Sequence, residues 1–142
     1  MAIATRTQRD TKIATGSGTA GGKVTVLVNM NDNTTADSVV LDASALAGHA
    51  NGAKLDITRI WWALVQGTAD DNTGWADIEF VGSSSDTKAI NLAGSGHYDG
   101  TAGKIENNAT NTGASSGDLK CNAYGVSGYI LIELRKDEAF TA

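Results

Sequence analysis

Alternation of apolar and polar positions is the clearest pattern along the chain, and it predicts β-strands. Val24, Val26 and Val28 recur at every second residue, which is the period of a strand covered on one side. Short runs of this kind, separated by stretches rich in glycine, asparagine and serine, predict strands at residues 23–29, 38–41, 55–66, 75–80, 87–92, around 105, at 119–124 and at 129–134. The pattern therefore favours a protein built from short strands.

Turn and cap signals lie between these runs. Asn31-Asp32-Asn33 predicts a turn after the first strand, and Asn51-Gly52 predicts a tight turn before the long third strand. A bulge is expected near Arg59, where the alternation slips by one position. Asp42 predicts the cap of a single helical turn through Ala45, which is the only helix expected.

The alternation also assigns side chains to faces. In residues 75–80 the acidic side chains are expected outside and the apolar ones inside, and in the last strand Ile130, Ile132 and Leu134 are expected to face the core. Trp61 and Trp62 are adjacent, so they must point to opposite faces. One of them is therefore expected in the core, and the other against a second sheet, a loop or another subunit.

The predicted fold class is all-β, an antiparallel, jelly-roll-like β-sandwich with an extended N-terminal arm. Many short strands without amphipathic helices favour a sandwich over a parallel sheet. The 142 residues suit one domain, and the single cysteine, Cys121, excludes an internal disulfide. The sequence contains no proline to protect exposed strand edges, so oligomerisation is one expected means of covering them.

Residues 1–22 are predicted to form a flexible basic arm before a single domain of residues 23–142. The arm ends in a glycine-rich stretch without periodicity. Residues 1–23 hold four basic residues and one acidic residue, whereas the remainder holds seven basic and 15 acidic residues. Arg6, Arg9 and Lys12 would then belong either to a solvated tail or to an arm that docks on an acidic neighbour. Deleting residues 1–22 is expected to leave the fold intact and to abolish attachment of the protein to such a neighbour.

Charge and hydropathy exclude some classes of partner. The net charge of −5 would repel phosphate backbones, so nucleic-acid binding is not expected. The polar start of the chain does not resemble a signal peptide, and the longest apolar run, residues 60–65, is too short to span a bilayer. A soluble protein without a membrane partner is expected.

No residue pattern specifies a reaction. His49 and His97 are isolated from each other, which argues against a metal site, and no motif around a serine supports a relay with His97 and Asp99. Asp70-Asp71-Asn72 lacks the spacing of a calcium loop and is interpreted as a polar turn. Gly94-Ser-Gly96 opens no helix, which excludes a dinucleotide fingerprint. Neither an enzyme, nor a cofactor, nor a metal, nor a small-molecule substrate is therefore expected.

Aromatic residues are the remaining candidates for function. The tryptophans, with Tyr98 and Tyr124, could anchor a protein interface or stack on sugars, as in carbohydrate-binding β-sandwich modules. Core packing is the simpler explanation for at least two of the three tryptophans. The candidate interface predicted from the sequence consists of Arg6, Arg9, Lys12, Trp61 and Trp62.

Five segments carry a resemblance to a known class of protein. They are Ile57-Thr-Arg-Ile-Trp-Trp62, Trp75-Ala-Asp-Ile-Glu-Phe80, Gly94-Ser-Gly-His-Tyr-Asp99, Ile105-Glu-Asn-Asn-Ala109 and Tyr129-Ile-Leu-Ile-Glu-Leu-Arg-Lys136. With them the chain resembles small virion proteins of tailed bacteriophages, particularly the capsid decoration or cement proteins of cyanophages and other marine phages.

The resemblance implies a structural role. A decoration protein of this kind would have a jelly-roll-like fold, form homotrimers on the three-fold positions of the capsid, and grip the major capsid protein with its arm. It would be made in the host cytoplasm, lie on the capsid surface of the virion, and need no cofactor. The alternative is a receptor- or carbohydrate-binding β-sandwich of a phage tail or cell surface.

Overall fold

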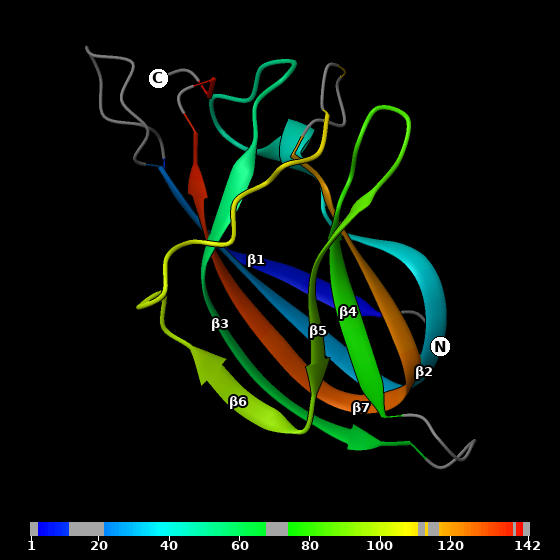
Figure 1. Cartoon of the computed structure of the whole chain (residues 1–142). Helices are drawn as coiled ribbons and strands as arrows, with labels where there is room; N and C mark the ends of the chain where they lie inside the picture. The colour runs from blue at the N-terminus through cyan, green and yellow to red at the C-terminus, as the bar shows by residue number, and fades with distance from the viewer. Residues whose placement is uncertain are drawn as a thin grey trace.

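A computed structural model describes residues 3–11, 22–67, 74–110, 113, 117–137 and 139–140. In this part of the chain the elements are β1 (Ala4–Asp10), β2 (Lys23–Leu41), the 3₁₀ turn η1 (Ala43–Ala45), β3 (Leu55–Gln66), β4 (Trp75–Phe80), β5 (Thr87–Ala93), β6 (Ser95–Tyr98) and β7 (Leu119–Lys136) (Figure 1). Every pairing between these strands is antiparallel. The predicted all-β, sandwich-like class is confirmed, and the finer jelly-roll order stays a prediction.

The long strands β2 and β7 form the centre of the structure, and both are bent. Asp32 and Asp37 adopt positive φ angles of 53° and 54° in β2, and β7 bends at Gly125 and Gly128. The prediction of a turn at residues 31–33 is wrong, as is the division of each long strand into two. Short aspartate side chains tolerate the left-handed conformation, so the same residues that form turns also form bulges within a strand.

The bends divide the sheet into two layers. The first layer has the order β1-β2-β7-β3-β6, and the second contains the later half of β2, the first half of β7, β4 and β5. In Figure 1, β4 and β5 run in a direction that crosses β1 and β2. Buried apolar residues from both layers form one core, among them Val26, Ile60, Ile78, Leu92 and Ile132.

The buried face of β7 changes phase at its bend. Residues 119, 121 and 123 are buried before the bend, and residues 130, 132 and 134 are buried after it. Gly128 has a φ angle of 130°, and a Cβ atom built on it would lie 1.9 Å from the carbonyl oxygen of Ala63. A glycine is required there because β7 passes so close to β3.

Several local predictions are confirmed. β3 has the predicted bounds, and the register shift between Ile57 and Arg59 is the expected bulge. Asp42 caps η1 by accepting a hydrogen bond from the Ser44 amide at 3.0 Å. Ile105 forms an isolated bridge with Ile57, which is the weaker element predicted near that position.

The prediction for β4 is correct for its apolar residues and wrong for one acid. Ala76, Ile78 and Phe80 are buried as expected, but Asp77 is also fully buried. Its carboxylate accepts hydrogen bonds from Lys88 Nζ at 3.0 Å and from Asn122 Nδ2 at 2.8 Å. A buried carboxylate is stable here because neighbouring strands supply its partners.

The composition of three further segments predicts loops or a frayed end, and all three contribute to the folded structure. The glycines of residues 94–100 predict a loop that carries an exposed His97, but residues 95–98 form β6, in which His97 is exposed. The small polar residues 107–117 predict a surface loop, but Asn107 and Ala109 are buried. Residues 139–142 are expected to be frayed, but Phe140 is 2% exposed. Each of these segments contains turn-forming or small residues that hide its contacts from a sequence pattern.

The prediction of a flexible arm is wrong for residues 4–10, because they form β1 and pair with β2. A buried lysine holds the end of this strand: Lys136 Nζ donates to Asp10 Oδ1 at 2.5 Å, to the Thr11 carbonyl at 2.8 Å and to the Ala47 carbonyl at 2.7 Å. The expectation that residues 1–22 can be deleted without harm does not fit these contacts. Lys12 and the glycine-rich stretch of residues 15–21 lie outside the described residues.

Candidate functional site

The outer side of the first layer presents side chains in rows that the strand register aligns. One row crosses all five strands through Arg6, Leu27, Leu131, Trp61 and His97. Directly paired residues project from the same face, and strands about 4.8 Å apart give this row a length of roughly 19 Å. We call this side of the layer the open face. Val65, farther along β3, also projects from it. The rows parallel to the first are Ala4–Asn29–Tyr129–Ala63–Ser95, Arg9–Thr25–Glu133–Arg59 and Lys23–Arg135–Asp56.

The centre of the open face is apolar and only partly covered. Leu27, Leu131 and Trp61 are half-buried, whereas Tyr129 is 40% exposed and Val65 is 64% exposed. These side chains are contiguous because they come from neighbouring strands in adjacent rows. A contiguous apolar patch on a protein surface is characteristic of an interaction site.

Trp61 stands on this face in a fixed orientation. Its ring stacks on His97 with centroids 4.8 Å apart and planes 9° apart. That spacing equals the distance between neighbouring strands, so the two rings stand side by side, perpendicular to the sheet. His97 covers one ring face, and the neighbouring strand that carries the paired Leu131 lies on the other side of Trp61.

Basic residues surround the apolar centre. The rows of the open face contain Arg6, Arg9, Lys23, Arg59 and Arg135, against the acids Glu133 and Asp56, so the net charge of the rows is +3. The whole chain has a net charge of −5. The open face is therefore the positive side of an acidic protein, which favours an acidic partner.

Glu133 holds several of these cations in place. Burial opposes its ionisation, but the Thr58 hydroxyl, which donates to Oε1 at 3.0 Å, together with Lys23, Arg59 and Arg9, keeps the pKa of Glu133 below its usual value. The Lys23 ammonium lies 3.6 Å from Oε1, and an Arg9 guanidinium nitrogen lies 3.5 Å from Oε2.

This environment predicts a pH-dependent contribution to stability. Because the folded pKa of Glu133 is lowered, its stabilising contribution is fully present above the unfolded pKa, near 4.5, and is lost as the pH falls through the lower folded value. The free energy of unfolding of Glu133→Gln should therefore lie below that of the wild type at pH 7, and the difference should shrink below pH 4.5. Urea unfolding at several pH values measures this difference in the free energy of unfolding. A difference independent of pH would contradict the lowered pKa of Glu133.

Carboxylates gather on the outer side of the second layer. Ligand oxygens of Asp37, Glu79 and Asp86 all lie within 4.8 Å of one another, the geometry in which three carboxylates can hold a cation. Burial, and then the charge of Asp77, raise the pKa of Glu79. Lys120 Nζ lies 2.9 Å from Asp86 and already supplies part of the compensating charge.

The structure unites part of the interface predicted from the sequence. Arg6, Arg9 and Trp61 lie on the open face, whereas Trp62 packs against the core and donates its Nε1 hydrogen to the Ala93 carbonyl at 3.0 Å. Lys12 lies outside the described residues. Sequence reasoning missed Leu27, Leu131, Tyr129 and Arg59, because their convergence with Trp61 depends on which strands pair.

Other residues considered for chemistry remain apart. Cys121 is buried, and its burial raises the pKa of the thiol to about 12, so it does not form a thiolate at neutral pH. Asp99 accepts hydrogen bonds from Thr101, which lower the pKa of its carboxyl, while the His97 ring stacks on Trp61. Asp70-Asp71-Asn72 lies outside the described residues.

Comparisons with known protein families, with curated proteins and with solved structures found no match. No helix in the described ranges has the length and apolar character that crossing a bilayer requires. The open face is therefore the candidate site, on the basis of its residues and geometry alone.

Proposed function

We propose that this protein is a structural virion protein, a capsid decoration or cement protein that binds the shell of a tailed virus through its open face. In this proposal it acts as a homotrimer on the capsid surface, after synthesis in the host cytoplasm, and its partner is the major capsid protein. The observation that carries the proposal is the contiguous apolar patch around Trp61, bordered by arginines, on a rigid sheet.

The chemistry of this face supports a protein partner. A patch with an apolar centre and a charged border has the composition of protein interfaces, in which tryptophan, tyrosine and arginine contribute most of the binding energy. Three of the segments that resemble phage virion proteins, residues 57–62, 94–99 and 129–136, contribute side chains to the open face. Many weak contacts repeated by symmetry on a shell would add up to stable attachment.

A carbohydrate receptor is the alternative function. Sugar recognition by tryptophan uses the flat face of the ring, and His97 already covers one face of Trp61, while the strand that carries Leu131 lies on the other side. The structure therefore favours the protein partner. A glycan array separates the two functions. A sugar receptor should bind some glycan as wild type and lose that binding in Trp61→Glu, whereas a decoration protein should show no such glycan.

The direct test is co-sedimentation of the purified protein with capsid shells of the virus that encodes it. Trp61→Glu places a charge in the apolar centre and should weaken attachment by at least about tenfold, since loss of a central aromatic anchor typically costs 2 kcal/mol or more. Trp75→Glu is the matched control, because Trp75 lies on the outer side of the other layer, where its ring stacks on Tyr124 with centroids 3.9 Å apart. Equal attachment of wild type and Trp61→Glu would reject the open face as the binding surface.

A further inference from the structure

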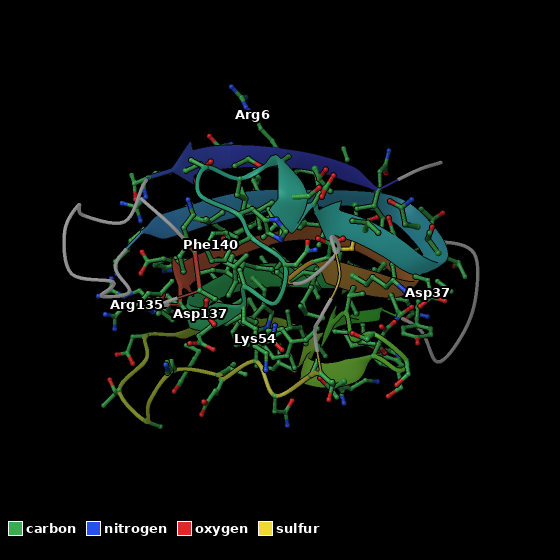
Figure 2. The ribbon with its side chains drawn as sticks, turned by 90° about the horizontal axis from the view of Figure 1, so that it is seen from above. Arg6, Asp37, Lys54, Arg135, Asp137 and Phe140 are labelled. Carbon is green, nitrogen blue, oxygen red and sulfur yellow. The ribbon has the colours of Figure 1, made fainter. Side chains whose placement is uncertain are left out.

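β1 forms one edge of the first layer, and its outer hydrogen-bonding side faces no other strand of the described part of the chain. Among the described residues it pairs with β2 alone, and all seven of its residues are exposed. Figure 2 shows β1 at the outer margin of the structure, with Arg6 pointing away from it. β1 contains neither proline nor lysine, two residues that commonly protect such an edge from pairing with another chain.

A hollow runs beside the inner side of this strand. It has a volume of about 330 Å³. Thr5, Thr7 and Asp10 of β1 form one wall, and the rest of the lining is Asp42 together with the apolar residues Val39, Val40, Leu41, Ala45 and Leu46. Val39 is 50% exposed, which is unusual for a valine so close to the core. A strand added to the edge of β1 would place every second side chain toward this hollow.

The edge is held in place before any partner arrives. At the end of β1, Asp10 Oδ1 accepts a hydrogen bond from buried Lys136, and Asp10 Oδ2 accepts one from the Ala47 amide at 2.8 Å. At the start of β1, Ile3 is 8% exposed. A template fixed at both ends avoids the entropic cost of ordering it during binding.

Charge distinguishes the two sides of an added strand. Arg6 projects from the side of β1 opposite the hollow, and none of the ion pairs in the described part of the chain involves it. Arg9 lies on the same side and makes one exposed contact with Glu133 at 3.5 Å. An added strand is therefore complementary if it carries apolar residues toward the hollow and acidic residues toward the arginines.

We propose that β1 is a strand-addition site for an extended segment of a partner protein in which apolar and acidic residues alternate. β-Augmentation of this kind combines main-chain hydrogen bonds, which give affinity, with alternate side chains, which give specificity. A second copy of β1 fits less well, because it would bring Thr5 and Thr7 to an apolar hollow and arginine toward arginine. This proposal uses Arg6 and Arg9 at the β1 margin of the open face, but it depends neither on the apolar centre around Trp61 nor on the virion role.

The test uses two fluorescein-labelled nine-residue peptides, one alternating valine with glutamate and the other alternating valine with lysine. Fluorescence anisotropy should show the glutamate peptide binding at least about tenfold more tightly, since two cross-strand charge contacts change sign between the peptides. Amide hydrogen exchange should become slower in residues 4–10 on binding. Arg6→Glu should remove most of the preference for the glutamate peptide. Val39→Glu should weaken binding of the glutamate peptide by a factor of about ten relative to the wild type.

Trp61→Glu is the control, because it changes the open face and leaves the hollow intact; it should bind the glutamate peptide like the wild type. Equal affinity for both peptides, or unchanged binding by Val39→Glu, would overturn the proposal. A dimer by light scattering, with the β1 amides already protected before peptide is added, would also overturn it, because a second copy would then occupy the edge.

Discussion

Asp10→Ala is expected to lower the free energy of unfolding by about 3 kcal/mol, the lower end of the loss for breaking a buried ion pair, because Lys136 is fully buried whereas the Asp10 side chain is 24% exposed. The side chain of Lys136 is fully buried, and its three N–H donors are used by Asp10 and by two backbone carbonyls. Removing the carboxylate leaves a positive charge in the interior with only neutral acceptors. Urea unfolding followed by tryptophan fluorescence measures the loss as a lower midpoint.

Arg9→Ala is the matched control for this prediction. Arg9 lies on the same strand and also reaches a carboxylate, but its side chain is 47% exposed and its contact with Glu133 is 3.5 Å long. Exposed pairs of this kind contribute at most about 1 kcal/mol. The double variant Asp10→Ala with Lys136→Met should recover part of the stability, because no unpaired charge remains buried. Equal losses in the two single variants would show that the buried pair has no special role.

Gly128→Ala is expected to have a comparable or larger effect, a loss of about 4 kcal/mol or more, at the upper end for single substitutions. The added Cβ would meet the Ala63 carbonyl at 1.9 Å, and the φ angle of 130° is one that side-chain-bearing residues rarely adopt. Relief would require β7 to move away from β3 in the middle of the first layer. The yield of folded protein and its thermal midpoint report the effect.

Gly94→Ala separates backbone strain from steric overlap. Gly94 also has a positive φ angle, 62°, but no atom lies within 4 Å of a Cβ built on it. Its substitution should therefore cost only the conformational penalty of about 1–2 kcal/mol. If the two alanine variants lost the same stability, the close approach of β7 to β3 would have no energetic consequence.

The sequence predicted the regular strands well, because their pattern is local. The bounds of β3 and β4, the bulge after Ile57 and the cap at Asp42 all follow from residues close together in the chain. The corner of β2 was mistaken for a chain reversal, and the corner of β7 for a break between two strands. An aspartate with positive φ is compatible with a hairpin and with a bulge inside a strand, and only the distant partner strand decides between them.

The candidate site could be predicted only in part for the same reason. Adjacent tryptophans required that one ring point away from the core, and the alternation in β7 placed Tyr129 and Leu131 away from the core. Their convergence with Leu27 depends on the β2–β7 and β7–β3 registers, which no local pattern contains. The buried Asp77 was missed likewise, because its partners Lys88 and Asn122 come from other strands.

The position of β7 also determines the order in which this protein can fold during synthesis. Most of β2 pairs with β7, and the contact between Lys136 and Asp10 joins residues 126 positions apart. Neither layer can close until the ribosome has released residues 119–136, whereas the β4–β5 hairpin can form earlier. Such long-range pairing slows folding and leaves β2 exposed in the meantime. The nascent chain should therefore be most prone to aggregation just before β7 emerges.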